Sequence, residues 1–139
     1  MLSEIAARLK AECAGLHEVQ GLAALSQLRG DPPAHLIPAA YVVLLDETPE
    51  SNSTTGAVLQ LVRLRFGVVL FVSSGADDMG GEAVGTLTAV RRQELSALLG
   101  WTPTGAEEGM TFGGGELMAV AAGTLRWMDV FETTTVYRS

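Results

Sequence analysis

The sequence has little of the chemistry that builds disulfide-linked or metal-linked scaffolds. It contains one cysteine, Cys13, and two histidines, His17 and His35, among 139 residues. One thiol cannot form an intrachain disulfide, and the histidines have no cysteine or carboxylate at ligand spacing. We therefore expect Cys13 to be a buried core residue, and we expect neither a metal site nor a cofactor.

Long apolar runs are also missing. The longest, Val68–Val72, is far shorter than the roughly 20 residues that cross a bilayer. The charged N-terminal segment lacks the apolar stretch of a signal peptide. The sequence thus predicts a soluble, intracellular protein without a membrane partner.

Basic residues are few and scattered. Nine Lys and Arg stand against 16 Asp and Glu, which gives a formal net charge of −7. Affinity for nucleic acid comes largely from neutralising phosphates, so this balance disfavours a protein that binds DNA or RNA.

Sequence patterns of catalysis are absent as well. No Gly-x-Ser-x-Gly motif occurs, and no serine has a partner histidine in its sequence context. The run Gly113–Gly115 precedes a predicted strand and lacks the Lys-Ser/Thr pair and the helix of a phosphate-binding loop. We expect no enzyme activity and name no catalytic residue.

The composition that is present is typical of one globular domain. With 139 residues, 47% of them hydrophobic and 18% charged, the chain can bury one core, which predicts a single domain over residues 1–139. The thin charged surface indicates that some apolar surface meets a partner.

Hydrophobic periodicity predicts an α+β fold. Helical spacing indicates two main helices, and alternating or continuous apolar runs indicate strands. The predicted helices cover 2–13 and 82–99, with a helical turn over 21–28, and the predicted strands cover 16–20, 39–45, 56–73, 116–121 and 125–137. We expect a single mixed or antiparallel sheet of about four to five strands with the two main helices packed on it.

Two arginines share one face of the long predicted strand 56–73. Arg63 and Arg65 form a small positive row, and the loop predicted over 46–55 carries Asp46, Glu47 and Glu50. One interpretation leaves both groups solvated. The other pairs the arginines with an acidic loop of a neighbouring subunit, because guanidinium groups suit bidentate carboxylate contacts.

Acidic residues also precede the second main helix. Asp77, Asp78 and Glu82 suit the positive N-terminal end of a helix, and the alternative is a divalent cation held by their oxygens. Within the helix, Arg91 and Glu94 project near the apolar stripe, where their spacing allows them to pair.

The closing strand 125–137 is polar on parts of both faces, which fits an interface strand as well as a core strand. Its charged residues join the earlier ones as candidate contacts between subunits. The full candidate set is Arg63, Arg65, Asp46, Glu47, Glu50, Arg126, Asp129 and Glu132.

Several segments together resemble the tail terminator-like proteins of tailed bacteriophages. In chain order they are VRLRFGVVL (62–70), LLGWTPTG (98–105), GGEL (114–117) and GTLRWMDVF (123–131), followed by Tyr137-Arg138. The opening helix around 7–10 and the strand around 38–42 agree with the resemblance, which covers nearly the whole chain.

The resemblance implies a structural protein of the virion, in the phage tail or neck, that is assembled in the host cytoplasm. Such a protein forms a ring, typically a hexamer, that caps the head-proximal end of the tail tube, stops tube polymerisation and offers a surface for head joining. The implied partners are further copies of the chain, the tail tube protein and a head–tail connector or neck protein. DNA would pass through the lumen without specific binding.

Two other functions stay open at this point. One is a neck or tail-completion protein of the same virion region. The other is a small α+β ligand-binding domain or enzyme whose site assembles only in three dimensions, because folds of this class host many functions.

Overall fold

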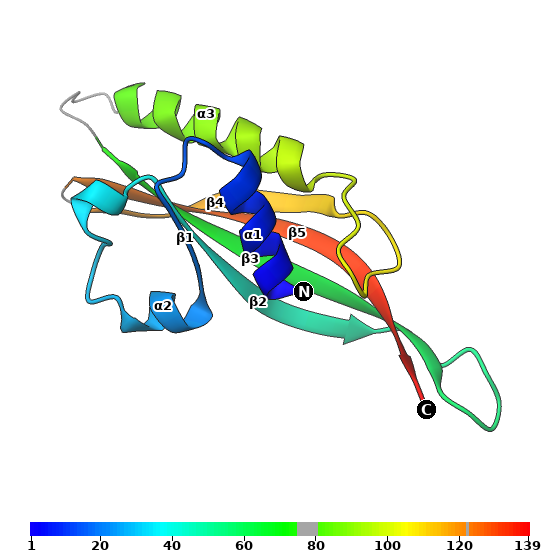
Figure 1. The fold of residues 1–139 in the computed structure, drawn as a ribbon. Coiled ribbons are helices and arrows are strands. Elements are labelled where there is room, and N and C mark those ends of the chain that lie inside the picture. Colours follow the sequence, from blue (N-terminus) through cyan, green and yellow to red (C-terminus); the bar gives the residue numbers. More distant parts are fainter. Residues whose placement is uncertain (75–80, 122) are drawn as a thin grey trace.

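A single five-stranded sheet organises the protein. The computed structural model describes residues 1–74, 81–121 and 123–139. Helices α1 and α3 cover one face of the sheet (Figure 1), and α2 packs on the other. The elements are α1 (Leu2–Glu12), β1 (Glu18–Gly21), α2 (Leu22–Gln27), the 3-10 turn η1 (Ala34–Leu36), β2 (Ala39–Pro49), β3 (Leu59–Ser73), α3 (Gly81–Leu98), β4 (Thr111–Ala121) and β5 (Thr124–Arg138).

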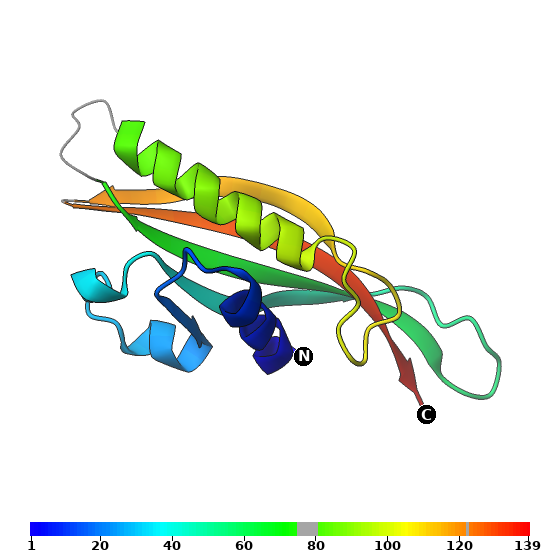
Figure 2. The ribbon, with the colours of Figure 1, turned by 45° about the horizontal axis from the view of Figure 1, so that its top comes forward.

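The strand order is β1-β2-β3-β5-β4. Strand β1 pairs with β2 in parallel, whereas the other neighbours are antiparallel. The spine is the β3–β5 pair, which stays in register from Leu59↔Arg138 to Ser73↔Thr124, and Figure 2 shows these two strands running the length of the sheet. The predicted α+β class, with one mixed sheet and two main helices, is confirmed.

Burial along β3 explains how the strand fits between two layers. Its first half alternates between buried and more exposed positions, but Phe66 to Val72 are all buried. A continuous apolar run belongs to a strand that is covered on both faces. The α1/α3 layer supplies one cover, and the smaller cluster around Tyr41 and Phe71 supplies the other, with α2 packed against it.

The predicted loop 46–55 is wrong over residues 46–49, and the glycine run 113–115 lies inside a strand rather than before one. Residues 46–49 continue β2 and pair with β3 after a register shift between Leu44 and Asp46, so their polar composition did not prevent pairing. The glycine run Gly113–Gly115 lies within β4, which pairs with β5 around a shift at Phe112/Gly114. The predicted roles of Asp77 and Asp78 fall outside the described residues.

Candidate functional site

The most constrained polar cluster joins α3 to the sheet. Strand β5 places Asp129 under α3, where its side chain is 0% exposed. From α3, Arg91 Nε donates to both carboxylate oxygens, at 3.2 and 2.9 Å, and Arg91 Nη2 donates to Oδ1 at 2.9 Å. Trp127 Nε1 donates to the same Oδ1 at 2.8 Å. A buried carboxylate with this many charge-assisted bonds fixes the helix on the strand.

This cluster corrects two expectations from the sequence. Arg91 pairs with Asp129 rather than with its helical neighbour Glu94. Asp129 has no exposed surface and therefore offers no atom to a neighbouring subunit in this conformation, although it was a candidate contact residue.

Glu94 lies in the same layer and is fully buried. Neither of its carboxylate oxygens has a hydrogen-bond partner among the described residues. Burial, and then the neighbouring Asp129 carboxylate, raise the pKa of Glu94 well above its ordinary value of 4.5. A retained proton removes the charge and gives the carboxyl a hydrogen to donate.

We expect Glu94→Gln to protect the fold at alkaline pH. The folded-state pKa of Glu94 is raised, so the stability that this group contributes is fully present below its ordinary pKa and is lost as pH rises through the folded-state pKa. Glutamine carries no such charge. Urea unfolding of both proteins at about pH 5 and about pH 8 measures the free energy of unfolding at each pH. Between these two pH values, that free energy should fall less in the variant than in the unmodified protein. A larger loss in the variant would contradict a protonated Glu94.

One member of the glycine run, Gly115, packs directly against this cluster. A Cβ on Gly115 would lie 2.5 Å from Asp129 Oδ1 and 2.9 Å from Trp127 Cζ2. Strand β4 therefore passes so close to the buried carboxylate that only glycine fits. Sequence reasoning missed this role, and the one available signal was three consecutive glycines before a short apolar strand.

Most of the candidate contact residues gather on the other face of the sheet from Asp129. Arg65 lies between two carboxylates on neighbouring strands, with Nη1 2.6 Å from Asp46 Oδ2 and Nε 3.5 Å from Glu132 Oε1. Arg63 Nη2 lies 3.9 Å from Glu50 Oε1. We call these five residues the charged row.

The charged row forms ion pairs within one chain. Its side chains are between 33% and 55% exposed. Exposed pairs of this kind contribute about 0–1 kcal/mol each, so the row is a weak stabiliser that a partner's charges could rearrange.

The two remaining candidates lie apart from the charged row. Glu47 accepts a hydrogen bond from Tyr137 Oη at 2.7 Å. Arg126 Nε is buried and has no hydrogen-bond partner among the described residues, and its Cζ lies 4.7 Å from the centroid of the Phe71 ring. Within the described residues, the guanidinium thus has an aromatic contact but no carboxylate partner.

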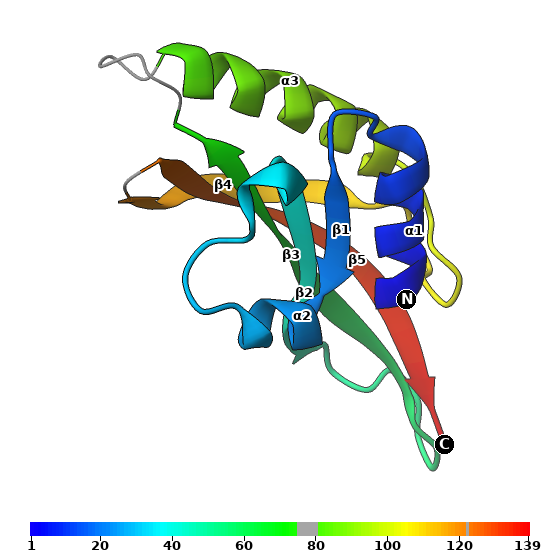
Figure 3. The ribbon, with the colours of Figure 1, turned by 60° about the vertical axis from the view of Figure 1, so that its left-hand side comes forward.

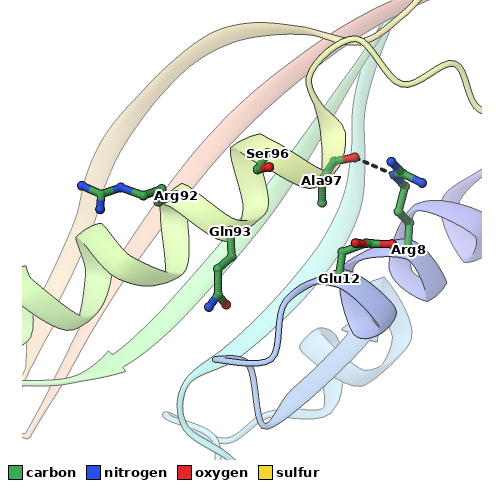
Figure 4. A pocket seen from close by; sticks show the side chains of 6 residues that line it. All are labelled: Arg8, Glu12, Arg92, Gln93, Ser96 and Ala97. Atoms are coloured by element: carbon green, nitrogen blue, oxygen red, sulfur yellow. Dashed lines mark hydrogen bonds between the residues drawn. The ribbon is translucent and has the colours of Figure 1, made fainter.

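Two open surface hollows lie beside α1. The larger groove, of about 710 Å³, is mainly apolar and lies between the start of α1 and the strands that hold Phe66 and Tyr137. A second hollow of about 290 Å³ lies between α1 and α3 (Figure 4), where Arg8 Nε donates to the carbonyl of Ala97. Its lining is Arg8, Glu12, Arg92, Gln93, Ser96 and Ala97. Over the part of the chain that the structure describes, no three His, Cys, Asp or Glu residues come together as a metal site would require.

The comparisons with known proteins identify the family. A family model described as phage tail terminator protein matches residues 1–139, which is the whole chain. The chain belongs to the phage tail terminator family. The terminator is therefore a structural protein of a phage virion.

A solved structure supports the fold of this terminator. A chain from the virion of a native gene transfer agent particle is similar to it, with a TM-score of 0.61 and 17% identity. The match covers 99% of the present chain and 95% of the other. At this identity the similarity concerns the fold. Comparison with curated proteins found no match.

No helix of the terminator within residues 1–74, 81–121 and 123–139 is both long enough and apolar enough to cross a bilayer.

Proposed function

We propose that the protein ends the growth of the phage tail tube. It forms a ring, typically a hexamer, on the head-proximal end of the tube, and the ring then offers the surface that joins the head. Assembly takes place in the host cytoplasm. The observation that carries this proposal is the family match over the whole chain, and the fold shared with a chain of a gene transfer agent virion supports it.

The surface of the chain suits such an assembly. A ring needs two unlike patches on each subunit, so that one patch of a subunit binds the other patch of the next. The sheet supplies two unlike edges, β1 and β4, and the charged row supplies exposed ion pairs that a tube or connector protein can exchange for its own. A net charge of −7 also suits a lumen that lets DNA pass, because a wall of like charge does not retain phosphates.

Tail assembly without and with the protein tests the proposal. Tail tube protein polymerised on its own initiation complex should give tubes of uncontrolled length, whereas added terminator should give tubes of one length with a ring at one end. Negative-stain electron microscopy measures both. Unlimited growth at saturating terminator would exclude the proposal, and binding only to tubes that had already stopped would favour a neck or tail-completion protein.

A further inference from the structure

Strand β4 is a free edge of the sheet, interrupted by register shifts at Phe112/Gly114 and Leu117/Ala119. Its backbone pairs with β5 on one side, and the structure gives it no second neighbour within the described residues. The strand has no proline or lysine and one charged residue, Glu116. Edge strands without such features invite pairing with another chain. The large apolar side chains on this edge are also exposed: Phe112 42%, Leu117 53%, Met118 47% and Val120 64%.

The opposite edge offers a receiving surface. Strand β1 pairs with β2 and, within the described residues, with no other strand. Figure 3 looks toward this side of the sheet and shows β1 between α1 and α2. A groove of about 430 Å³ opens between α1 and β1, with Ala6, Val19 and Val42 among its apolar lining. Leu22 borders it and is 58% exposed.

The two edges run in opposite directions. Strand β1 is parallel to β2, and three successive antiparallel pairings lead from β2 through β3 and β5 to β4. Strand β4 is therefore antiparallel to β1. Rotation about an axis along the strands preserves strand direction, so β4 of one copy meets β1 of the next in an antiparallel arrangement.

The paired residues of neighbouring strands also align in height across the sheet. One level of the sheet runs Val19–Ala40–Leu70–Trp127–Leu117, and the next runs Gln20–Tyr41–Val69–Met128–Glu116. If two copies join without a shift, Leu117 lies across from Val19, on the face that carries the α1 groove. Glu116 lies across from Gln20, whose amide is a donor, on the other face.

Charge complementarity favours a second copy of this chain as the partner of the free β1 edge. A third level runs Glu18–Ala39–Phe71–Arg126–Ala119. Arg126 has no carboxylate partner among the described residues, and Glu18 accepts only the amide of Gln20. In the joined sheet these opposite charges share one level and are separated by strand β4, which places the small side chain of Ala119 at that level. The Arg126 guanidinium, which lies over the Phe71 ring within one copy, would turn toward β4 to approach the neighbour's Glu18.

We propose that β4 of one copy adds to the free edge of β1 of the next, with its exposed Leu117 at the α1–β1 groove and Arg126 paired with the neighbour's Glu18. The sheets of successive copies then form one continuous band around the ring. The inference rests on the proposed function, because only a ring or a capped tube brings the copies together in a fixed order.

Disulfide trapping tests the strand pairing. Residues directly opposite in an antiparallel pair have Cα atoms about 4.5–5.5 Å apart, within reach of a disulfide. A Gln20→Cys/Glu116→Cys double variant, assembled on tail tubes and mildly oxidised, should give a ladder of covalent oligomers on a non-reducing gel. An equal mixture of the two single variants should stop at dimers, and each single variant should remain monomeric. Burial raises the pKa of the Cys13 thiol to about 11, so the natural cysteine stays unreactive in all four samples.

A second pair covers a different level of the sheet. Glu18→Cys/Ala119→Cys should give the same ladder, and a ladder from either double variant supports the strand addition. Capped tubes that yield only monomers with both pairs would overturn the inference and leave the proposed function intact. Tubes that remain uncapped with the unmodified protein would reject the proposed function itself, and the inference with it.

Discussion

Replacing Asp129 with alanine should lower the free energy of unfolding by about 3 kcal/mol. The substitution leaves Arg91, whose side chain is 26% exposed, and the Trp127 indole without the carboxylate that both of them bind. Removing one member of a buried pair costs more than the pair itself contributes, because the remaining charge stays partly desolvated. Urea unfolding followed by Trp fluorescence and by circular dichroism measures the loss.

The matched control is Asp129→Asn, which keeps the shape and one oxygen acceptor. It should lose less stability than the alanine variant. In a double-mutant cycle with Arg91→Ala, the two residues should show a coupling of about 1–3 kcal/mol. Losses that simply add would mean that the Arg91–Asp129 contact does not hold α3 on the sheet.

Phe131→Ala should be at least as damaging, with an expected loss of about 3–5 kcal/mol. The ring is 0% exposed and belongs to the core under α1 and α3. Removing the ring leaves a cavity in the core beside the middle of β5. Because β5 is paired with β3 and β4 on its two sides, the backbone cannot easily move in to fill that cavity. Thermal and urea unfolding measure the change.

Phe112 offers a control of the same chemistry at the edge. Its ring contacts Phe131 edge-on, with the centroids 5.9 Å apart, but is 42% exposed. Phe112→Ala should cost about 1 kcal/mol, mainly the aromatic pair. Equal losses of unfolding free energy at Phe112 and Phe131 would show that burial does not determine the cost of removing the ring.

The sequence predicts the α+β class and the order of the main elements because the apolar periodicities of α1, α3, β3 and β5 are long. It fails at polar strand segments. Residues 46–49 read as a loop from composition, yet their place in β2 is decided by the partner strand and by the shift at Leu44/Asp46. A single sequence does not contain that register.

Chemistry within the site is predictable only in part. The sequence predicts that Arg63 and Arg65 pair with carboxylates. In the structure their carboxylate partners come from the same chain, on or next to the neighbouring strands. The Arg91–Asp129 contact joins residues 38 positions apart on different elements, and periodicity reports only which face each residue occupies. Gly115 lies close to Asp129 and Trp127 of this cluster. The sequence therefore could not predict that close approach either.

The long register between β3 and β5 has a mechanical consequence. The pairing continues without a shift over all 15 residues of each strand. Because antiparallel hydrogen bonds lie perpendicular to the strands, a load along the strand axis shears all these bonds together instead of opening them one by one. A subunit pulled along the strand axis therefore resists in its strongest direction.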